Sequence, residues 1–155
     1  MAIDVVRDYL KQWNREKDIL EFAVSSATVE LAAEAAGVIP ARIAKTMSFY
    51  DKVGCILVVT AGDRKIDNVK FKQFFGMKAR MLAPADVLLF TGHEIGGVCP
   101  FAIESPAVRI YCDSSMKRFN TVFPACGSSN SAIELTCDEL FEYAKAIEWI
   151  DVCKD

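Results

Sequence analysis

The stretch KTMSFYDKVGCILVVT, residues 45–60, decides the fold class of this chain. Lys45–Tyr50 alternates in the manner of a strand, and Asp51–Gly54 has the composition of a tight turn. Cys55–Thr60 is a continuous apolar run rich in β-branched residues, which is typical of a strand buried on both faces. The stretch therefore predicts two strands joined by a turn, the second of them inside the protein.

Helical patterns precede these two strands. Apolar residues at helical spacing predict an amphipathic N-terminal helix that ends near Asn14. A second helix is expected over Val29–Ala36, where Gly37 supplies a left-handed C-terminal cap. Pro40 fits the first turn of a short helix. Lys45 is therefore expected where helix gives way to sheet.

Further helices and strands alternate after residue 60. Asn68–Phe75 is expected to form a helix closed by Gly76, and Met77–Leu82 a short strand. Pro84 then opens a helix that runs through Phe90. The remaining expected elements are strands over Val108–Cys112, Asn120–Phe123 and Ala132–Leu135, and a final helix from Cys137 to about Ile147 with a capping box of Thr136 and Glu139.

The order of these elements predicts an α/β fold. Interleaved strands and helices, with some strand connections too short for a crossover helix, imply a mixed sheet. The 155 residues correspond to one average domain, and no internal repeat or linker divides them. We therefore expect a single domain over residues 1–155.

Composition and charge exclude several classes of protein. Hydrophobic residues make up 52% and charged residues 25% of the chain, which excludes a disordered or low-complexity protein. A formal net charge of -3 argues against a protein that holds long nucleic acid by counterion release, so DNA is not an expected partner. No apolar run approaches the roughly 18 residues of a membrane span, and the N-terminus lacks a signal-peptide pattern. We expect a cytoplasmic protein without a membrane partner.

The six cysteines are expected to be reduced thiols, because they occur singly in a chain long enough to build its own core. No CxxC pair is present, and His93 is the only histidine. The spacing of a structural zinc site or of a thioredoxin-type dithiol is therefore missing. We expect neither a metal nor another cofactor.

Three features could carry chemistry once the common nucleotide-binding, serine hydrolase and zinc protease motifs are found to be absent. Lys45 has apolar neighbours, so its ammonium could grip a phosphate, a carboxylate or a carbonyl oxygen, or it could only extend from the end of a sheet into water. Gly96 and Gly97 could present backbone N–H groups to an anion, or form only a tight turn. The polar loop that begins at Gly127 is the third feature.

His93 and Cys99 each have a functional and a structural interpretation. His93 could carry a proton, but a lone histidine in a glycine-rich loop is more often a hydrogen-bonded structural residue. Cys99 could be a reactive thiol, but no basic neighbour in the sequence lowers its pKa, so we favour a small buried hydrophobe.

Taken together, these features resemble the YbaK/EbsC family of aminoacyl-tRNA deacylases, relatives of the editing domain of bacterial prolyl-tRNA synthetases. The resemblance implies a single α/β domain with a curved, barrel-like mixed sheet surrounded by helices, and it implies that Lys45 is the functional lysine. Its markers are AAEAAGV at residues 32–38, PARI leading to AKT at 44–46, AGD at 61–63 before ID at 66–67, TGHEIGGVCP at 91–100 and AIEL at 132–135.

The resemblance also implies which residues surround the substrate. One loop would contribute Gly96, Gly97, Val98, Cys99 and Pro100. A second loop would contribute Gly127, Ser128 and Ser129.

The leading hypothesis for function is hydrolysis of the ester between a small, wrongly attached amino acid, such as alanine or cysteine, and the 3′ end of a tRNA. By resemblance this is a proline tRNA, and an aminoacyl-tRNA synthetase is a second candidate partner. Lys45 would hold the terminal nucleotide or the ester carbonyl, while N–H groups around Gly96 and Gly97 would face the oxyanion. The alternatives are a non-catalytic module that binds a small ligand or partner protein, and a thiol redox protein that uses Cys99.

Overall fold

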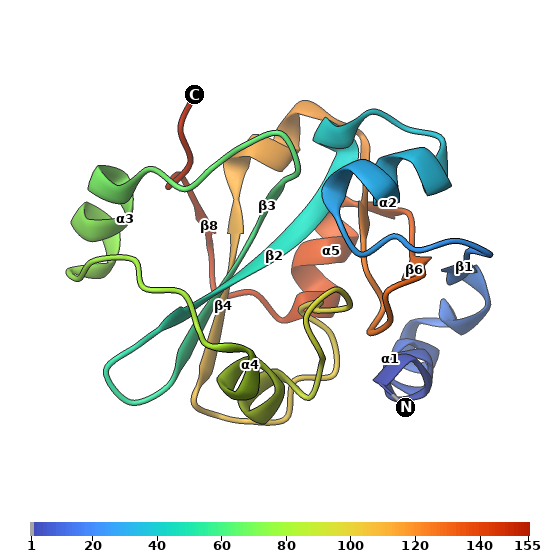
Figure 1. The fold of residues 1–155 in the computed structure, drawn as a ribbon, viewed down its shortest axis with the longest axis horizontal. Coiled ribbons are helices and arrows are strands. Elements are labelled where there is room, and N and C mark those ends of the chain that lie inside the picture. The colour runs from blue at the N-terminus through green and yellow to red at the C-terminus, as the bar shows by residue number, and fades with distance from the viewer. Residues whose placement is uncertain (1) are drawn as a thin grey trace.

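The computed structural model describes residues 2–155, and an antiparallel pair of strands lies at its centre (Figure 1). β2 (Ile43–Tyr50) pairs with β3 (Cys55–Ala61), with Tyr50 opposite Cys55 across the turn. Every residue of β3 is buried. The two predicted strands, and the burial of the second on both faces, are confirmed.

The sheet around this pair is mixed, as expected. Its strand order is β7-β5-β2-β3-β4-β8, in which the β2–β3 and β5–β7 pairs are antiparallel and the β2–β5, β3–β4 and β4–β8 pairs are parallel. The outer strands are β4 (Val108–Asp113), β5 (Thr121–Pro124), β7 (Leu135–Thr136) and β8 (Trp149–Ile150); β1 (Leu20–Glu21) and β6 (Ser131–Ala132) form a separate antiparallel pair.

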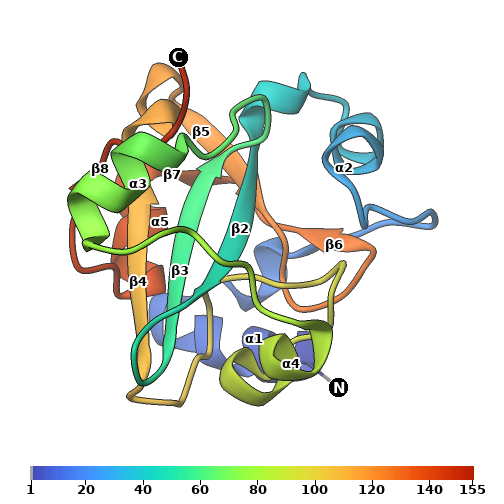
Figure 2. The ribbon, with the colours of Figure 1, turned by 60° about the vertical axis from the view of Figure 1, so that its left-hand side comes forward.

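Helices cover both faces of the sheet. Ile56 and Val58 of β3 pack in one cluster with Phe71 of α3, whereas Val59 packs with Leu140 of α5 on the opposite face. Figure 2 shows α3 in front of the sheet and α5 behind it. The described helices are α1 (Ala2–Leu10), α2 (Val29–Ala36), α3 (Asn68–Phe75), α4 (Pro84–Thr91) and α5 (Cys137–Ala144), with short 3-10 turns at Lys11–Trp13, Glu16–Asp18, Pro40–Arg42 and Ser114–Arg118. The α/β fold with a curved mixed sheet is confirmed.

The helix ends lie where local chemistry predicts them. Gly37 and Gly76 adopt positive φ angles at the ends of α2 and α3. Thr136 and Glu139 form the expected capping box at the start of α5. The last helix ends at Ala144, before the predicted Ile147, because Lys145 adopts the left-handed conformation.

Two predicted strands are wrong. Met77–Leu82 is not a strand: it runs beside the end of β2 and forms only an isolated bridge between Met81 and Phe49. Ala132–Leu135 is not continuous, because the chain leaves one sheet and enters the other within it: Ala132 pairs with Leu20 in β1, and Leu135 pairs with β5.

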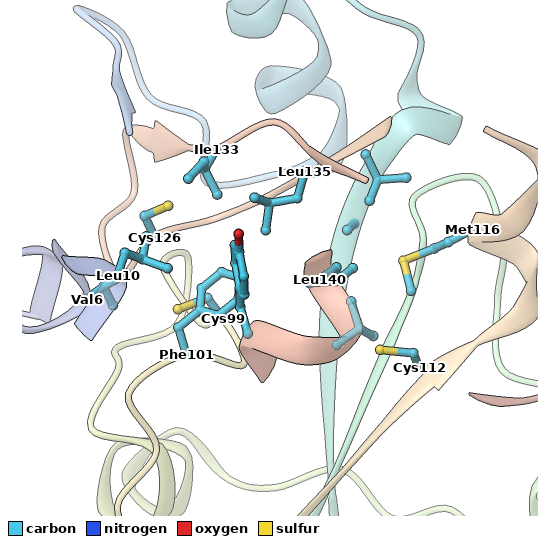
Figure 3. Close-up of a cluster of buried hydrophobic side chains, with 14 of the residues drawn as sticks. Val6, Leu10, Cys99, Phe101, Cys112, Met116, Cys126, Ile133, Leu135 and Leu140 are labelled. Atoms are coloured by element: carbon cyan, nitrogen blue, oxygen red, sulfur yellow. The ribbon is translucent and has the colours of Figure 1, made fainter. Parts of the chain in front are cut away.

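The largest core cluster lies between α1, α5 and the sheet (Figure 3). Cys99, Cys126 and Cys112 are fully buried in it, and Phe101 and Leu10 pack in the same cluster. All six cysteines are free thiols, as expected. Among the described residues, no helix has the length and apolar character needed to cross a membrane.

Candidate functional site

A cavity of about 230 Å³ lies along the free edge of β2. β5 pairs with β2 only at Ile43 and Ala44, and Met81 bridges β2 at Phe49, so the edge between these points has no partner strand. The start of α2, one side of α4 and the loop at residues 95–98 close the cavity around this gap. Its walls are largely apolar, as is usual for a small-molecule site.

Thr46 lies in the middle of this unpaired edge. Backbone groups along a strand alternate in direction. The Leu82 amide donates to the Ser48 carbonyl, and the Tyr50 amide donates to the Arg80 carbonyl, so Thr46 also directs its N–H and C=O away from β3. Its Oγ1 is buried and has no hydrogen-bond partner. Thr46 therefore offers the backbone N–H and C=O of an unpaired strand edge to whatever occupies the cavity, while its hydroxyl stays buried.

Lys45 lines the same cavity and is half-buried. Its Nζ donates a hydrogen bond to the Arg64 carbonyl, in the loop that follows β3. Burial lowers the pKa of Lys45, and the nearby Cys153 and Asp63 oppose this effect. Of the described residues that line the cavity, Lys45 is the only one with a titratable side chain.

The glycine loop contributes only part of the cavity wall. Gly96, with φ +97°, and Val98 line the cavity, and Gly97 does not. A Cβ on Gly97 would lie 2.8 Å from the Ser128 amide nitrogen, so this glycine allows two loops to touch. The N–H of Gly97 donates to the Glu94 carbonyl and is not free for a ligand, whereas those of Gly96 and Val98 have no acceptor in the described part of the chain.

The second loop lies behind the cavity. Gly127 packs against the start of α1, since a Cβ on it would lie 2.9 Å from the Ala2 carbonyl. The Ser129 carbonyl accepts hydrogen bonds from the amide and the hydroxyl of Ser26. Ser129 thus supports the segment at residues 26–28, which itself lines the cavity, whereas Gly127 contacts α1 and Ser128 contacts Gly97.

Cys99 and Pro100 are buried in the interior, away from the cavity lining. The Cys99 Sγ lies 3.4 Å from His93 Nε2, and that nitrogen is also 2.9 Å from the Phe101 carbonyl. Burial raises the pKa of Cys99 to about 12 and lowers the pKa of His93. The redox alternative is therefore not supported, because it requires an accessible thiolate.

Sequence reasoning missed Thr46 and the segment at residues 26–28. The available signal for Thr46 was a pair of polar residues, Thr46 and Ser48, at alternate positions of an otherwise apolar strand. No local signal marks Ser26, because it reaches the cavity only through the contact with Ser129. No group of three or more potential ligands among the described residues could hold a metal ion.

This fold and cavity define a small α/β module with a single lysine in an apolar pocket. Residues 24–143 match the family model described as "Aminoacyl-tRNA editing domain", and the chain belongs to that family.

Similar proteins agree with this assignment. The chain is 60% identical to the uncharacterized protein YwhH of Bacillus subtilis (strain 168), over 100% of this chain and 99% of that protein. It is 28% identical to the proline--tRNA ligase of Thermosipho africanus (strain TCF52B), over 94% of this chain but only 26% of the ligase. A solved structure described as a candidate trans-editing enzyme for prolyl-tRNA synthetase superposes with a TM-score of 0.89 at 25% identity, covering 99% of this chain and 98% of that one.

Proposed function

We propose that this protein hydrolyses the ester bond between a small, wrongly attached amino acid and the 3′ end of a tRNA. The observation that carries this proposal is Lys45, half-buried at the wall of a small apolar cavity in a member of the editing-domain family. A cationic group there would bind the phosphate of the terminal nucleotide or the ester carbonyl.

The size of the cavity supports a small amino acid. Its volume of about 230 Å³ is below the roughly 300–1,000 Å³ typical of sites for drug-sized ligands. The side chains of Val29, Val87 and Met81 form apolar walls. Alanine and cysteine fit such a site, and a separate editing pocket is needed where one methylene gives the synthetase only about 1–3 kcal/mol of discrimination.

The reaction needs few groups from the protein. Water attacks the ester carbonyl, the tetrahedral oxyanion collapses, and the ribose hydroxyl leaves with a proton. The free N–H groups of Gly96 and Val98 would stabilise the oxyanion, and the unpaired backbone N–H and C=O of Thr46 would bind the attacking water or the α-amino group. Since Lys45 is the only titratable side chain that residues 2–155 contribute to the cavity wall, positioning replaces general base catalysis in this mechanism.

A proline tRNA is the proposed tRNA, and prolyl-tRNA synthetase is the proposed partner. The support for both is the match to a part of each of two proline--tRNA ligases, 26% of the Thermosipho africanus protein and 20% of that of Thermotoga maritima (strain ATCC 43589 / DSM 3109 / JCM 10099 / NBRC 100826 / MSB8).

The test is a deacylation time course on proline tRNA charged with alanine, cysteine, serine or proline. We expect selective hydrolysis by the wild type and a loss of at least about 100-fold in Lys45→Ala, a size typical of losing a group that stabilises the transition state. Lys17→Ala is the matched control, because Lys17 is exposed and lies outside the cavity. Full activity in folded Lys45→Ala would reject the site.

A non-catalytic binding module is the second candidate. The observation that favours it is the lack of a second titratable group in the cavity wall of the described chain. This alternative predicts that the wild type binds aminoacyl-tRNA but hydrolyses none of the four charged forms. The same time course, combined with a binding measurement, therefore distinguishes the two functions.

A further inference from the structure

A run of positive charge lies outside the cavity, in a chain whose formal net charge is -3. Residues 68–85 contain Lys70, Lys72, Lys78 and Arg80 and no aspartate or glutamate. They comprise α3, the segment that follows it, and the first residues of α4. Positive charge is therefore concentrated on one part of an otherwise acidic protein.

The structure gathers two of these lysines around one groove. The groove has a volume of about 650 Å³, and it is lined by Asn68, Val69, Lys72, Gln73, Lys78 and Ala79. Lys70 is engaged with Asp151 and Asp155, whereas Lys72 and Lys78 are exposed and form no ion pair with any described residue. The groove thus offers two uncompensated ammonium groups beside two side-chain amides.

The groove connects to the cavity along the chain itself. Figure 2 shows the segment after α3 crossing the front of the sheet towards α4. Lys78 and Ala79 line the groove, and Met81 and Leu82, two residues further on, line the cavity. Between them, the Arg80 guanidinium lies 4.4 Å from the centre of the Tyr50 ring. The chain therefore continues from a groove lysine into the cavity wall within four residues.

We propose that this groove, formed by α3 and residues 76–80, binds backbone phosphates of the acceptor arm of the tRNA whose 3′ end enters the cavity. The inference rests on the proposed function, because it takes the ligand of the cavity to be an aminoacyl-tRNA. Lysine ammonium groups bind phosphates as point charges without reading the bases. A contact limited to a few phosphates is consistent with the acidic charge of the whole chain.

The experiment uses fluorescence anisotropy with an uncharged RNA hairpin that reproduces an acceptor arm, at salt concentrations from about 50 to about 200 mM. The variant is Lys72→Glu with Lys78→Glu. The matched control is Lys11→Glu with Lys17→Glu, because these exposed lysines follow α1, on the side of the molecule away from α3, and the change in charge is the same (Figure 1). Lys72→Gln with Lys78→Gln removes charge without adding repulsion.

We expect the groove variants to bind the RNA about tenfold or more weakly, and the slope of log affinity against log salt to become shallower by about 1–2. The control should stay within about twofold of the wild type. Equal affinities and slopes for groove and control variants, or no binding of the hairpin by the wild type, would overturn the inference. Thermal unfolding checks that each variant is folded.

Deacylation measured in parallel separates this inference from the proposed function. If RNA binding depends on Lys72 and Lys78 but no charged tRNA is hydrolysed, the proposed function is rejected and the groove is still an RNA-binding site. Hydrolysis that depends on Lys45 but has the same salt dependence in the groove variants would keep the function and reject the groove.

Discussion

The side chain of Thr46 lowers the stability of the folded protein. Its buried hydroxyl has no partner, and an unsatisfied buried polar group costs about 1–3 kcal/mol. Thr46→Val keeps the shape and removes the hydroxyl, so we expect the free energy of unfolding to rise by about 1 kcal/mol and deacylation to stay at the wild-type rate, because the buried hydroxyl cannot reach the substrate. Urea unfolding and single-turnover hydrolysis test the two effects separately. A destabilised variant with full activity would show that the hydroxyl has a structural role instead.

His93 predicts how stability responds to acid. Burial lowers its pKa from the ordinary 6.5, so below pH 6.5 the unfolded chain binds a proton more readily than the folded protein does. Stability should therefore fall as the pH decreases from about 7 to about 5, a range in which the carboxylates titrate little. His93→Gln should lack this slope, because His93 is the only histidine. The measurement is the urea midpoint of the wild type and of His93→Gln at several pH values. If the midpoints of the two proteins change with pH in parallel, the prediction is wrong.

The sequence predicted the roles of these individual residues unevenly. The burial of Cys99 was expected from its lack of a basic neighbour, and the hydrogen bond of His93 from its place in a glycine-rich loop. The unpaired hydroxyl of Thr46 was not expected, because it depends on where β5 stops pairing with β2. Whether a polar atom is satisfied depends on contacts between distant segments, which a single sequence does not specify.

At the scale of elements, the contact between the two loops is held by Gly97. A methyl group there would meet the backbone of Gly127 and Ser128 at 2.8–2.9 Å. We expect Gly97→Ala to destabilise the protein by about 1–3 kcal/mol, as overpacking does, and also to reduce deacylation, because the 95–98 loop in the cavity wall would move away from Gly127 and Ser128. Thermal unfolding and the deacylation assay measure both.

Gly92→Ala is the control for this prediction. Gly92 has φ +75° but open space around its Cβ position, so alanine there strains the backbone by about 1–2 kcal/mol without moving a loop. We expect it to lower stability and leave hydrolysis unchanged. Equal losses of activity in the two variants would mean that global stability, and not the loop contact, limits the reaction.

Helices were predicted better than short strands, for a physical reason. The cap of α2 at Gly37 and the capping box of α5 use residues within a few positions of the helix. The local sequence is therefore enough to predict where these helices end or begin. A strand exists only where a partner lies beside it. Met77–Leu82 alternates apolar and polar residues as a strand does, but it meets β2 only at a single bridge. β8 was not predicted, because its two residues are defined by their pairing with β4.

On the scale of the whole molecule, the cavity is assembled from segments that are far apart in the chain. Lys45 and Thr46 come from β2, and Gly96 and Val98 come from a loop. Other walls come from residues 26–28, α2, the segment before α4, α4 itself, β5 and β6. The motifs indicated Lys45 and the glycine loop as candidates, and only the resemblance to a family joined them into one site. Ser129 supports the wall formed by residues 26–28, and this contact depends on the tertiary structure alone.

The C-terminal segment is connected to Lys45 through the loop at residues 62–66. The Lys45 ammonium donates to the Arg64 carbonyl, and the Lys154 amide donates to the neighbouring Lys65 carbonyl at 2.8 Å. The Arg64 guanidinium in turn donates to the Lys154 carbonyl at 3.1 Å. The position of the cavity lysine is thus fixed partly by the last residues of the chain.

Deletion of Cys153–Asp155 tests this connection. It removes the two hydrogen bonds of Lys154, the one from Lys70 to the Cys153 carbonyl, the exposed ion pair between Lys70 and Asp155, and the buried Cys153 side chain, while Val152 keeps its amide bond to Asp113. At about 1 kcal/mol for each hydrogen bond, with the loss of the buried side chain added, we expect the free energy of unfolding to fall by at least about 3 kcal/mol. Deacylation at saturating protein should also fall, because the Arg64 carbonyl no longer holds the ammonium of Lys45 in place. If the truncated protein is less stable but hydrolyses its substrate at the wild-type rate, then β2 alone positions Lys45 and the C-terminal segment serves only stability.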